Sequence, residues 1–484
     1  MNKILYISSE AFPLVKTGGL ADVAGSLPVA VKQHAQDIRL CLPAYPEVIS
    51  KLKHYDVRTE TRYYNQSVRI LQSTLPGSDV TLWLVDCPSL FMRPGGPYSD
   101  AHGHEWHDNA LRFAVFCRAA ADIARDQLQL DWAADIVHCN DWQSGLVPAF
   151  LEQHTDRPAS VFTIHNLAYQ GLFNQQTFYD LNLPPELWHF NALEFYGQLS
   201  FIKGGLVFAD KLTTVSPNYA REICLPEFGY GLDGLLRYRE DDLLGILNGI
   251  DHQHWDPQTD HHLPHHYNSR SLDNKTLNKL ALQKKLGLEE DAEIPMLGMV
   301  SRLVEQKGLE IILQCLPLLQ HKPLQLVILG TGELHYEIQL AEFAQQHPHK
   351  VSVTIGYNEA LAHQIEAASD LYLMPSSFEP CGLNQLYSLR YGTLPIVNAV
   401  GGLADTVVHA SEQNRKRKTA NGFVLQNYSS AALLDTIDQA CALFPQKKLW
   451  QQLQINGMKC DHSWDNRAQH YITLYDSLLC EKRV

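Results

Sequence analysis

The sequence predicts an α/β protein made of two doubly wound domains, each built on a parallel sheet buried on both faces. Short continuous apolar runs alternate with longer helix-like stretches, which is the pattern of a parallel sheet covered by helices. A chain of 484 residues is also too long for one hydrophobic core. The pentapeptide Gly-Gly-Leu-Ala-Asp occurs at residues 18–22 and again at 401–405. We therefore expect two halves of similar architecture, each with a glycine turn that faces a ligand.

The apolar runs place the strands in two sets, separated by a polar stretch. In the first half we expect strands at 3–8, 38–42, 80–85, 136–139, 160–164 and 212–215. In the second half we expect them at 296–300, 324–329, 351–355, 371–374 and 394–397. A histidine-rich segment from Asn248 to about Ser271 lies between the sets, so we predict a domain boundary near Asn248 and a surface segment after it. Two such sheets facing each other predict a deep cleft at the carboxyl ends of their strands.

Composition narrows the class of protein. With 45% hydrophobic and 19% charged residues, the chain resembles an ordinary globular protein, and its net charge of -14 argues against a nucleic-acid or anionic-membrane partner. No stretch reaches membrane-spanning length and the N-terminal apolar run is too short for a signal peptide, so we expect a cytoplasmic protein. Ten cysteines without a Cys-x-x-Cys pair predict no disulfide and no zinc site.

The first candidate site is the turn formed by residues 16–22. Lys16 precedes the pair Gly18-Gly19, which opens directly into a helical pattern that includes Asp22. Glycines let backbone N–H groups approach an anion, and the helix start and the lysine add positive charge. This pattern predicts a phosphate cradle, although a glycine pair is about as often a plain turn or a helix-packing site.

Two further candidates follow strands in the second half. Arg302 and Lys307 lie on one predicted loop and helix start, and an arginine fork with a lysine point charge can neutralise a departing diphosphate. Glu379 lies beside Pro380 and a Cys-Gly turn whose Gly382 allows close backbone approach. The alternatives are solvated surface cations and a carboxylate at a helix start.

In the first half, His165-Asn166 and Asp141-Trp142 each follow a predicted strand. Imidazole, amide and carboxylate groups can hydrogen-bond sugar hydroxyls, and an indole face suits the C–H groups of a sugar ring. A structural histidine and a helix N-cap are the alternatives for His165 and Asp141.

Two other motifs are weaker indications of a functional site. The histidines at 252–266 lie in a proline-punctuated segment with no fixed i, i+4 helical pair and no attached glutamate base, so we expect exposed side chains and no metal there. The histidines at 102–107 lie in a loop with Gly95, Gly96 and Tyr98, and we expect no metal there either. Gly330-Thr331-Gly332 lacks the third glycine of a dinucleotide fingerprint, leaving a two-glycine turn near a ribose or phosphate as the remaining interpretation.

Taken together, the motifs resemble those of the bacterial glycogen synthase and plant starch synthase family. They occur in order across almost the whole chain, in the segments 16–23, 165–171, 215–217, 247–251, 301–308, 379–383, 391–395 and 401–407. The resemblance implies the glycosyltransferase-B fold of two Rossmann-like domains facing a cleft. It also implies that a helix within 461–484 completes the first domain, 1–247, and that 248–460 form the nucleotide-sugar domain.

The same resemblance implies a reaction and its residues. Glucose would pass from ADP-glucose, with retention, to the non-reducing end of an α-1,4-glucan (glycogen or a maltooligosaccharide), without cofactor or metal. It implies catalytic roles for His165, Arg302, Lys307 and Glu379, and a contact to acceptor or loop for Tyr98. Donor-binding roles are implied for Lys16, Gly18, Gly19, Asp22, Asp141, Asn166, Asn248, Tyr357, Cys381, Gly382 and Leu383.

Several positions depart from the family pattern. Around Asp141, Cys139 stands where the family has alanine, and Asn140 and Gln143 stand where it has histidine. Val400 and Asn384 stand where threonine is common. These changes bear on donor affinity and nucleotide choice. A UDP-glucose donor, a short oligosaccharide acceptor and a catalytically idle glucan-binding protein therefore stay open as alternatives.

Overall fold

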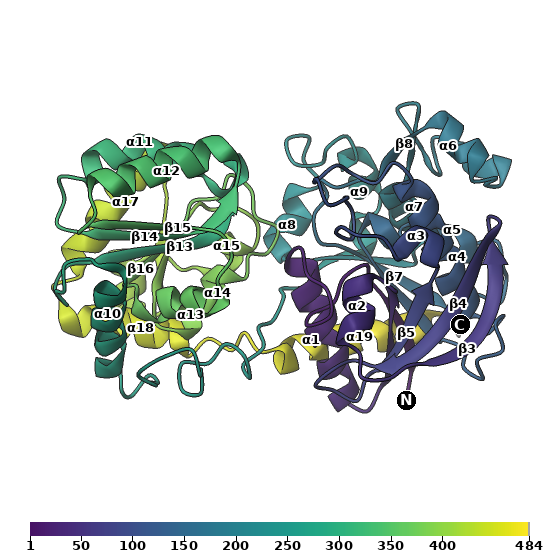
Figure 1. Cartoon of the computed structure of the whole chain (residues 1–484), viewed down its shortest axis with the longest axis horizontal. Coiled ribbons are helices and arrows are strands. Elements are labelled where there is room, and N and C mark those ends of the chain that lie inside the picture. Colours follow the sequence, from purple (N-terminus) through teal and green to yellow (C-terminus); the bar gives the residue numbers. More distant parts are fainter. Residues whose placement is uncertain (483–484) are drawn as a thin grey trace. The chain divides into compact units, whose positions relative to one another are not determined.

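The computed structural model describes residues 1–482 and divides the chain into two compact units (Figure 1). The first comprises Met1–Gly249 with the described residues from Trp464 onward, and the second comprises Ile250–Ser463. The predicted domains end at 247 and 460, and the last two residues of the predicted segment 461–484 lie outside the described residues. Within residues 1–482, no helix has the length and apolar character needed to cross a membrane.

The core of the first domain is a nine-stranded sheet, counted over the described chain. From β12 to β5 the strands run parallel in the order β12-β11-β7-β6-β1-β2-β5. This is a Rossmann order, in which the chain starts at the centre and winds outward on both sides. The strands of this parallel part are β1 (Lys3–Ile7), β2 (Asp37–Pro43), β5 (Thr81–Asp86), β6 (Ile136–Asn140), β7 (Ala159–Ile164), β11 (Lys211–Thr214) and β12 (Leu243–Gly245).

An antiparallel hairpin extends this sheet and was not predicted. β3 (Asp56–Tyr63) and β4 (Gln66–Thr74) pair with each other, and β4 pairs antiparallel with β5. The turn residues Tyr64 and Asn65 have φ values of 50° and 61°, as the two-residue type I′ turn requires. No residue of β3 is fully buried, so no continuous apolar run marks this edge strand. A small separate sheet joins β8 (Leu172–Asn174), β10 (Gln198–Ser200) and β9 (Glu194–Phe195).

The second domain repeats the Rossmann plan. Its six strands, all within the described residues 250–463, run parallel in the order β15-β14-β13-β16-β17-β18. Helices α11, α12 and α17 cover one face of this sheet and α10 and α13 the other (Figure 1). The strands are β13 (Met296–Leu303), β14 (Gln325–Gly332), β15 (Val351–Ile355), β16 (Leu371–Met374), β17 (Leu394–Val397) and β18 (Phe423–Val424).

Strands β13 and β14 run further than expected, which corrects two predictions. Arg302 lies within β13 and pairs in register with Thr331 of β14, so it is not on a loop. Gly330 and Gly332 lie in strand β14 rather than in a turn. A Cβ on either residue would lie 2.0 or 2.2 Å from a carbonyl oxygen of β13, so only glycine fits at these positions. These glycines permit close strand pairing.

The helices of the first domain include one that comes from the far end of the chain. In α19, Tyr475 hydrogen-bonds His138 of β6 through its hydroxyl and Nδ1 at 2.6 Å, and Asp476 accepts from Asn2 at 2.8 Å. The first-domain helices are α1 (Gly19–Gln33), α2 (Pro46–Lys51), α3 (Pro88–Phe91), α4 (Asn109–Ala124), α5 (Leu146–Leu151), α6 (Gln175–Asp180), α7 (Phe201–Phe208), α8 (Pro217–Glu222), α9 (Asp233–Tyr238) and α19 (Trp464–Lys482).

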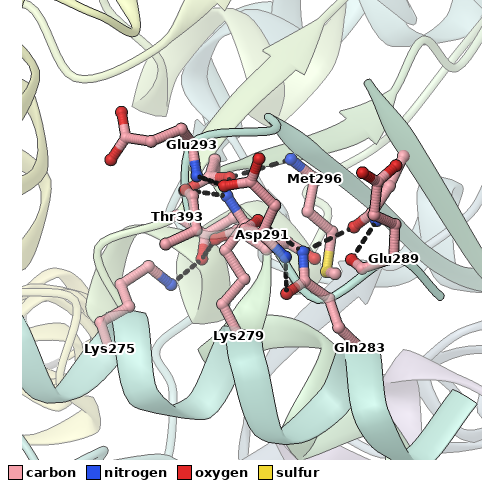
Figure 2. Close-up of polar contacts among 12 residues, drawn as sticks. Lys275, Lys279, Gln283, Glu289, Asp291, Glu293, Met296 and Thr393 are labelled. Atoms are coloured by element: carbon pink, nitrogen blue, oxygen red, sulfur yellow. Dashed lines mark hydrogen bonds and ion pairs between the residues drawn. The ribbon is translucent and has the colours of Figure 1, made fainter. Parts of the chain in front are cut away.

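Helix α10 of the second domain is held by buried polar groups. Lys275, Lys279 and Gln283 are spaced by four residues, so they share one face of the helix, and that face is buried (Figure 2). Lys279 forms an ion pair of 2.7 Å with Asp370. Lys275 donates to the carbonyl oxygens of Glu366 and Ala367, in the last turn of α13, where a cation is favoured.

The second-domain helices are α10 (Asp273–Leu286), α11 (Leu309–Leu319), α12 (Leu334–Gln346), α13 (Glu359–Ala368), α14 (Asn384–Arg390), α15 (Gly401–Thr406), α16 (Glu412–Arg417), α17 (Ser430–Leu443) and α18 (Lys447–Met458).

Candidate active site

The glycine turn of the first domain is open to solvent. Gly18 is the N-cap of α1 in extended backbone, and residues 16–19 are exposed. A Cβ on Gly18 would meet no atom within 4 Å. Lys16 forms an ion pair of 2.7 Å with Asp22 in the first turn of the helix. The turn therefore presents backbone N–H groups and a helix N-terminus on an accessible face, where anions are favoured.

A buried carboxylate already uses part of this cradle. Glu10, which is 3% exposed, accepts hydrogen bonds from the backbone N–H of Thr17 at 2.5 Å, the Thr17 hydroxyl at 2.6 Å and the Gly18 N–H at 3.3 Å. Tyr98 donates its hydroxyl to the same carboxylate at 2.5 Å. Glu10 therefore fixes both the turn and Tyr98. Sequence reasoning missed it, although an acidic residue just past the end of β1 was a usable signal.

His165 and Asn166 directly follow β7 and lie against Asp141, which follows β6. The Asp141 carboxylate accepts from the backbone N–H of His165 at 2.7 Å and of Asn166 at 3.4 Å. His165 Nε2 lies 2.9 Å from Asn140 Oδ1, and because this amide oxygen can only accept, Nε2 carries the proton. Burial lowers the pKa of His165 to about 3, so the ring is neutral and its Nδ1 is an acceptor.

Asp141 holds its position with a strained backbone. Its φ of 54° and ψ of -178° fall in a region that is essentially restricted to glycine and costs about 1–3 kcal/mol. Burial raises the pKa of its carboxyl to about 7, against the lowering effect of the two N–H groups that it accepts. Strain and a shifted pKa at one residue are typical of functional sites.

The indole beside Asp141 packs against aromatic rings, although Trp142 is not fully buried. The Trp142 ring lies edge-on to Phe113, with centroids 4.9 Å apart, and close to Phe173 and Phe201. A Cβ on Gly171 would lie 2.4 Å from this ring, so the glycine is required by the packing.

In the second domain an ion pair joins two predicted catalytic residues. Lys307 lies in a short 3-10 turn, Glu305–Lys307, between β13 and α11, and its Nζ lies 2.5 Å from Glu379 Oε2. The same oxygen accepts from the Ser376 hydroxyl at 3.0 Å, and Glu379 is buried. Arg302 is exposed, and no described residue forms an ion pair with its guanidinium.

The second glycine pair is buried, so the prediction of a ligand-facing turn in each half fails here. Gly401 has φ of 43°, and a Cβ there would lie 1.9 Å from the Glu379 carbonyl oxygen. The Gly402 N–H donates to the carbonyl oxygens of Glu379 and Pro380 at 3.2 and 3.1 Å. The pair therefore seats the Glu379 loop against the start of α15.

The remaining predicted residues differ in their surroundings. Asn248 is buried, and its Oδ1 has no hydrogen-bond partner among the described residues. Tyr357 follows β15 and is 80% exposed. Cys381 is buried next to Gly382, whose φ is 71°, and Leu383 packs in a small cluster with residues of α14.

Each domain thus gathers its predicted residues at the carboxyl edge of its own sheet, where doubly wound proteins bind ligands. In the first domain the residues follow β1, β6, β7 and β12, except Tyr98, which follows α3. In the second they follow β13, β15 and β16 or lie at the end of β13.

Two Rossmann domains of this kind define the glycosyltransferase-B class of fold, and comparison with known proteins agrees. A model described as the starch synthase catalytic domain matches residues 3–238, and one described as glycosyl transferases group 1 matches residues 280–452. The catalytic domain of starch synthase IV from Arabidopsis thaliana, solved with ADP and acarbose, superposes with a TM-score of 0.89 at 30% identity over 99% of both chains. Sucrose-phosphate synthase from Thermosynechococcus elongatus, 15% identical with a TM-score of 0.61, shares the fold.

Sequence relatives define the family more narrowly. Glycogen synthase from Cellvibrio japonicus is 55% identical, covering 99% of this chain and all of its own length. Glycogen synthase 1 from Methylococcus capsulatus is 51% identical, covering 99% of this chain and 97% of its own. The chain belongs to the glycogen and starch synthase family, as its motifs predicted.

Proposed function

We propose that this protein is a retaining glucosyltransferase that elongates an α-1,4-glucan from ADP-glucose. The observation that carries the proposal is the ion pair between Lys307 and buried Glu379, next to β13, in which exposed Arg302 is the last residue but one. One cation near the end of a strand and another on the connection to the next helix suit a departing diphosphate. Family membership supports the donor and the polymer, and the Arabidopsis relative was solved bound to ADP and acarbose.

The second domain would stabilise the leaving group. Arg302 and Lys307 neutralise the charge that develops on ADP as the bond to the glucose anomeric carbon breaks. Glu379 holds Lys307 with Oε2, while its Oε1 makes no hydrogen bond to a described residue and can accept from sugar hydroxyls. Cys381, Gly382, Leu383 and Tyr357 would contact the donor.

The first domain would bind the sugar and the phosphates. The Nδ1 acceptor of neutral His165 hydrogen-bonds a glucose hydroxyl, and the His165 backbone carbonyl stabilises positive charge at the anomeric carbon. Asp141 keeps His165 and Asn166 in place through their N–H groups, and Asn248 lines the same pocket. Gly18 and Gly19 would line the diphosphate site, with Gly19 donating its N–H group because the Gly18 N–H already donates to Glu10. Lys16, Asp22 and Tyr98 would order that turn.

The transfer would need no metal or cofactor, because the two cations supply the charge. We also infer that the enzyme acts in the cytoplasm, which its relationship to the glycogen synthases supports. The glucan acceptor is glycogen or a maltooligosaccharide.

The test compares labelled glucose incorporation into glycogen from ADP-glucose and from UDP-glucose, both in excess EDTA. We expect polymer growth from ADP-glucose and little from UDP-glucose. Growth from UDP-glucose alone would overturn the donor assignment. Growth from neither donor, by a protein that still binds glycogen, would overturn the enzymatic function.

A further inference from the structure

The histidine-rich segment after the domain boundary lies on the second domain with several side chains buried against it, while others, such as His265, are exposed. The Trp255 ring is stacked between His363 of α13 and Tyr387 of α14, with centroid distances of 3.8 and 3.9 Å and interplanar angles of 9° for both pairs. Leu263 and Tyr267 of the same segment are buried. The segment and α13 therefore share a continuous interface inside residues 250–463.

Three metal-ligating side chains converge at this interface. His254 Nε2 lies 2.8 Å from Glu359 Oε1. One ligand atom each from His254, Glu359 and His363 can be chosen so that all lie within 4.8 Å of one another. Glu359 and His363 are four residues apart in α13, which puts them on one face of the helix.

The hydrogen bonding of His363 indicates that this cluster can bind a ligand. The side chain is fully buried, and its Nδ1 lies 2.8 Å from Asp260 Oδ2. Because a carboxylate accepts, Nδ1 carries the proton and Nε2 has a free lone pair. Nε2 is buried and has no hydrogen-bond partner among the described residues, a state that is rare because it costs free energy.

Asp260 completes an arrangement found around metal-bound histidines. Its Oδ2 also accepts from the Tyr391 hydroxyl at 2.6 Å, and its Oδ1 accepts from the His262 N–H at 2.9 Å. Histidine ligands generally donate their second N–H to a carboxylate, which fixes the tautomer and the ring. The half-buried side chains of His254 and Glu359 leave a route from solvent.

We propose that His254, Glu359 and His363 bind a divalent transition-metal ion, with Asp260 orienting His363. Two imidazoles and one carboxylate suit zinc, with water in a fourth position, whereas magnesium and calcium prefer oxygen ligands. The ion would fasten the segment after the domain boundary to α13. This role is structural and does not depend on the proposed glucosyl transfer, in which none of these residues takes part.

The test is a zinc titration of the full chain after EDTA treatment and removal of the chelator, followed by calorimetry. Cobalt(II) absorption provides a second readout, because nitrogen and oxygen ligands lack the intense thiolate bands of cysteine sites. The variants are His254→Gln and Glu359→Gln, both at partly exposed positions. The matched control is His265→Gln, an exposed histidine of the same segment that is not in the cluster.

We expect one strong zinc site in the native chain and in His265→Gln, with a rise in thermal midpoint on zinc addition. Each ligand variant should weaken binding by more than the roughly 10- to 100-fold that loss of an outer partner costs. Thermal midpoints measured in EDTA show whether each variant folds. If one of the two ligand variants is unfolded, the zinc affinity of the other variant and the cobalt spectrum of the native chain test the proposal. Equal zinc affinity in all four proteins, or a thiolate-type cobalt spectrum, would overturn the proposal.

Discussion

Residues 18–22 of the first domain and 401–405 of the second have the same sequence but lie in opposite surroundings. Gly18 is exposed and a Cβ there would touch nothing, whereas a Cβ on Gly401 would overlap the Glu379 carbonyl oxygen at 1.9 Å. The first pair leaves N–H groups accessible, and the second brings two backbone segments together. A glycine pair can therefore expose a backbone or pack one, and its neighbours decide which.

The predicted sites of the two domains also differ in what their buried carboxylates bind. In the first domain Glu10 and Asp141 accept backbone N–H groups and hold loops in place. In the second, Glu379 holds an ammonium group, that of Lys307. At the predicted site, the carboxylates of the first domain thus hold backbone N–H groups, whereas Glu379 of the second holds a charged side chain.

The sharpest test of the glycine comparison is Gly401→Ala, for which we expect the largest effect. Its φ of 43° and the overlap with backbone atoms predict a loss of more than about 4 kcal/mol in the free energy of unfolding, enough to prevent stable folding. The matched variant Gly18→Ala should change stability by less than about 0.5 kcal/mol. Urea unfolding of both proteins measures this, and similar losses would break the comparison.

Asp141→Asn tests the buried carboxylate of the first domain through pH. Because the pKa of Asp141 is raised from 3.8 to about 7, the folded chain binds more protons than the unfolded chain between these pH values. Native stability therefore falls as pH rises from about 4 to 7, at up to about 1.4 kcal/mol per pH unit. The asparagine variant has no ionisable group at this position, so its stability does not fall for this reason.

Calorimetric midpoints of the two proteins should accordingly diverge in favour of the asparagine variant across that window. His138 and His165, whose pKa values are lowered to about 3, occur in both proteins and cancel in the difference. Parallel pH curves would show that Asp141 is ionised throughout.

Lys307→Ala tests the paired charges of the second domain. Loss of a charged contact to the leaving diphosphate should lower kcat/KM about a hundredfold, equivalent to about 3 kcal/mol of transition-state stabilisation. Steady-state kinetics with ADP-glucose measure it. Lys416→Ala is the control, because within residues 1–482 Lys416 forms its ion pair with Glu412 alone, and both side chains are exposed. An unchanged kcat/KM would remove Lys307 from the mechanism.

Glu10→Gln should have the smallest effect of the series. The amide keeps one acceptor but turns an NH2 group toward donors, which should cost about 2 kcal/mol of stability and raise the KM for ADP-glucose. Thermal unfolding and kinetics measure the two effects, with exposed Glu47→Gln as the control. A variant with native stability would mean that the turn orders itself without this carboxylate.

Sequence patterns predicted the features that depend on local order. The buried parallel strands stand out as apolar runs, and His165, Asn166 and Asp141 follow strand ends as ligand-binding residues do. The hairpin of β3 and β4 was missed because β3 has no buried residue and β4 buries only Val68, Ile70 and Leu71, so neither strand forms a long apolar run. The different surroundings of the two glycine pairs could not be foreseen, because they depend on segments distant in the chain.

The cluster at α13 shows the same limit. His254 and Glu359 are 105 residues apart, so inspecting the histidine-rich segment alone reveals no ligand set. The i, i+4 pair Glu359 and His363 was visible in the helix, but only the fold places it against that segment. Contacts between residues so far apart in sequence depend on tertiary packing, so a local sequence pattern does not reveal them.

The return of α19 to the first domain bears on the order of synthesis. Residues 1–249 leave the ribosome first, yet His138 and Asn2 gain their partners Tyr475 and Asp476 only after residues 250–463 have been made. The second domain is continuous in sequence and can be completed earlier. During translation, the surface of the first domain that α19 covers therefore stays exposed until the end of synthesis. The first domain is thus the part of the chain that most needs protection from aggregation.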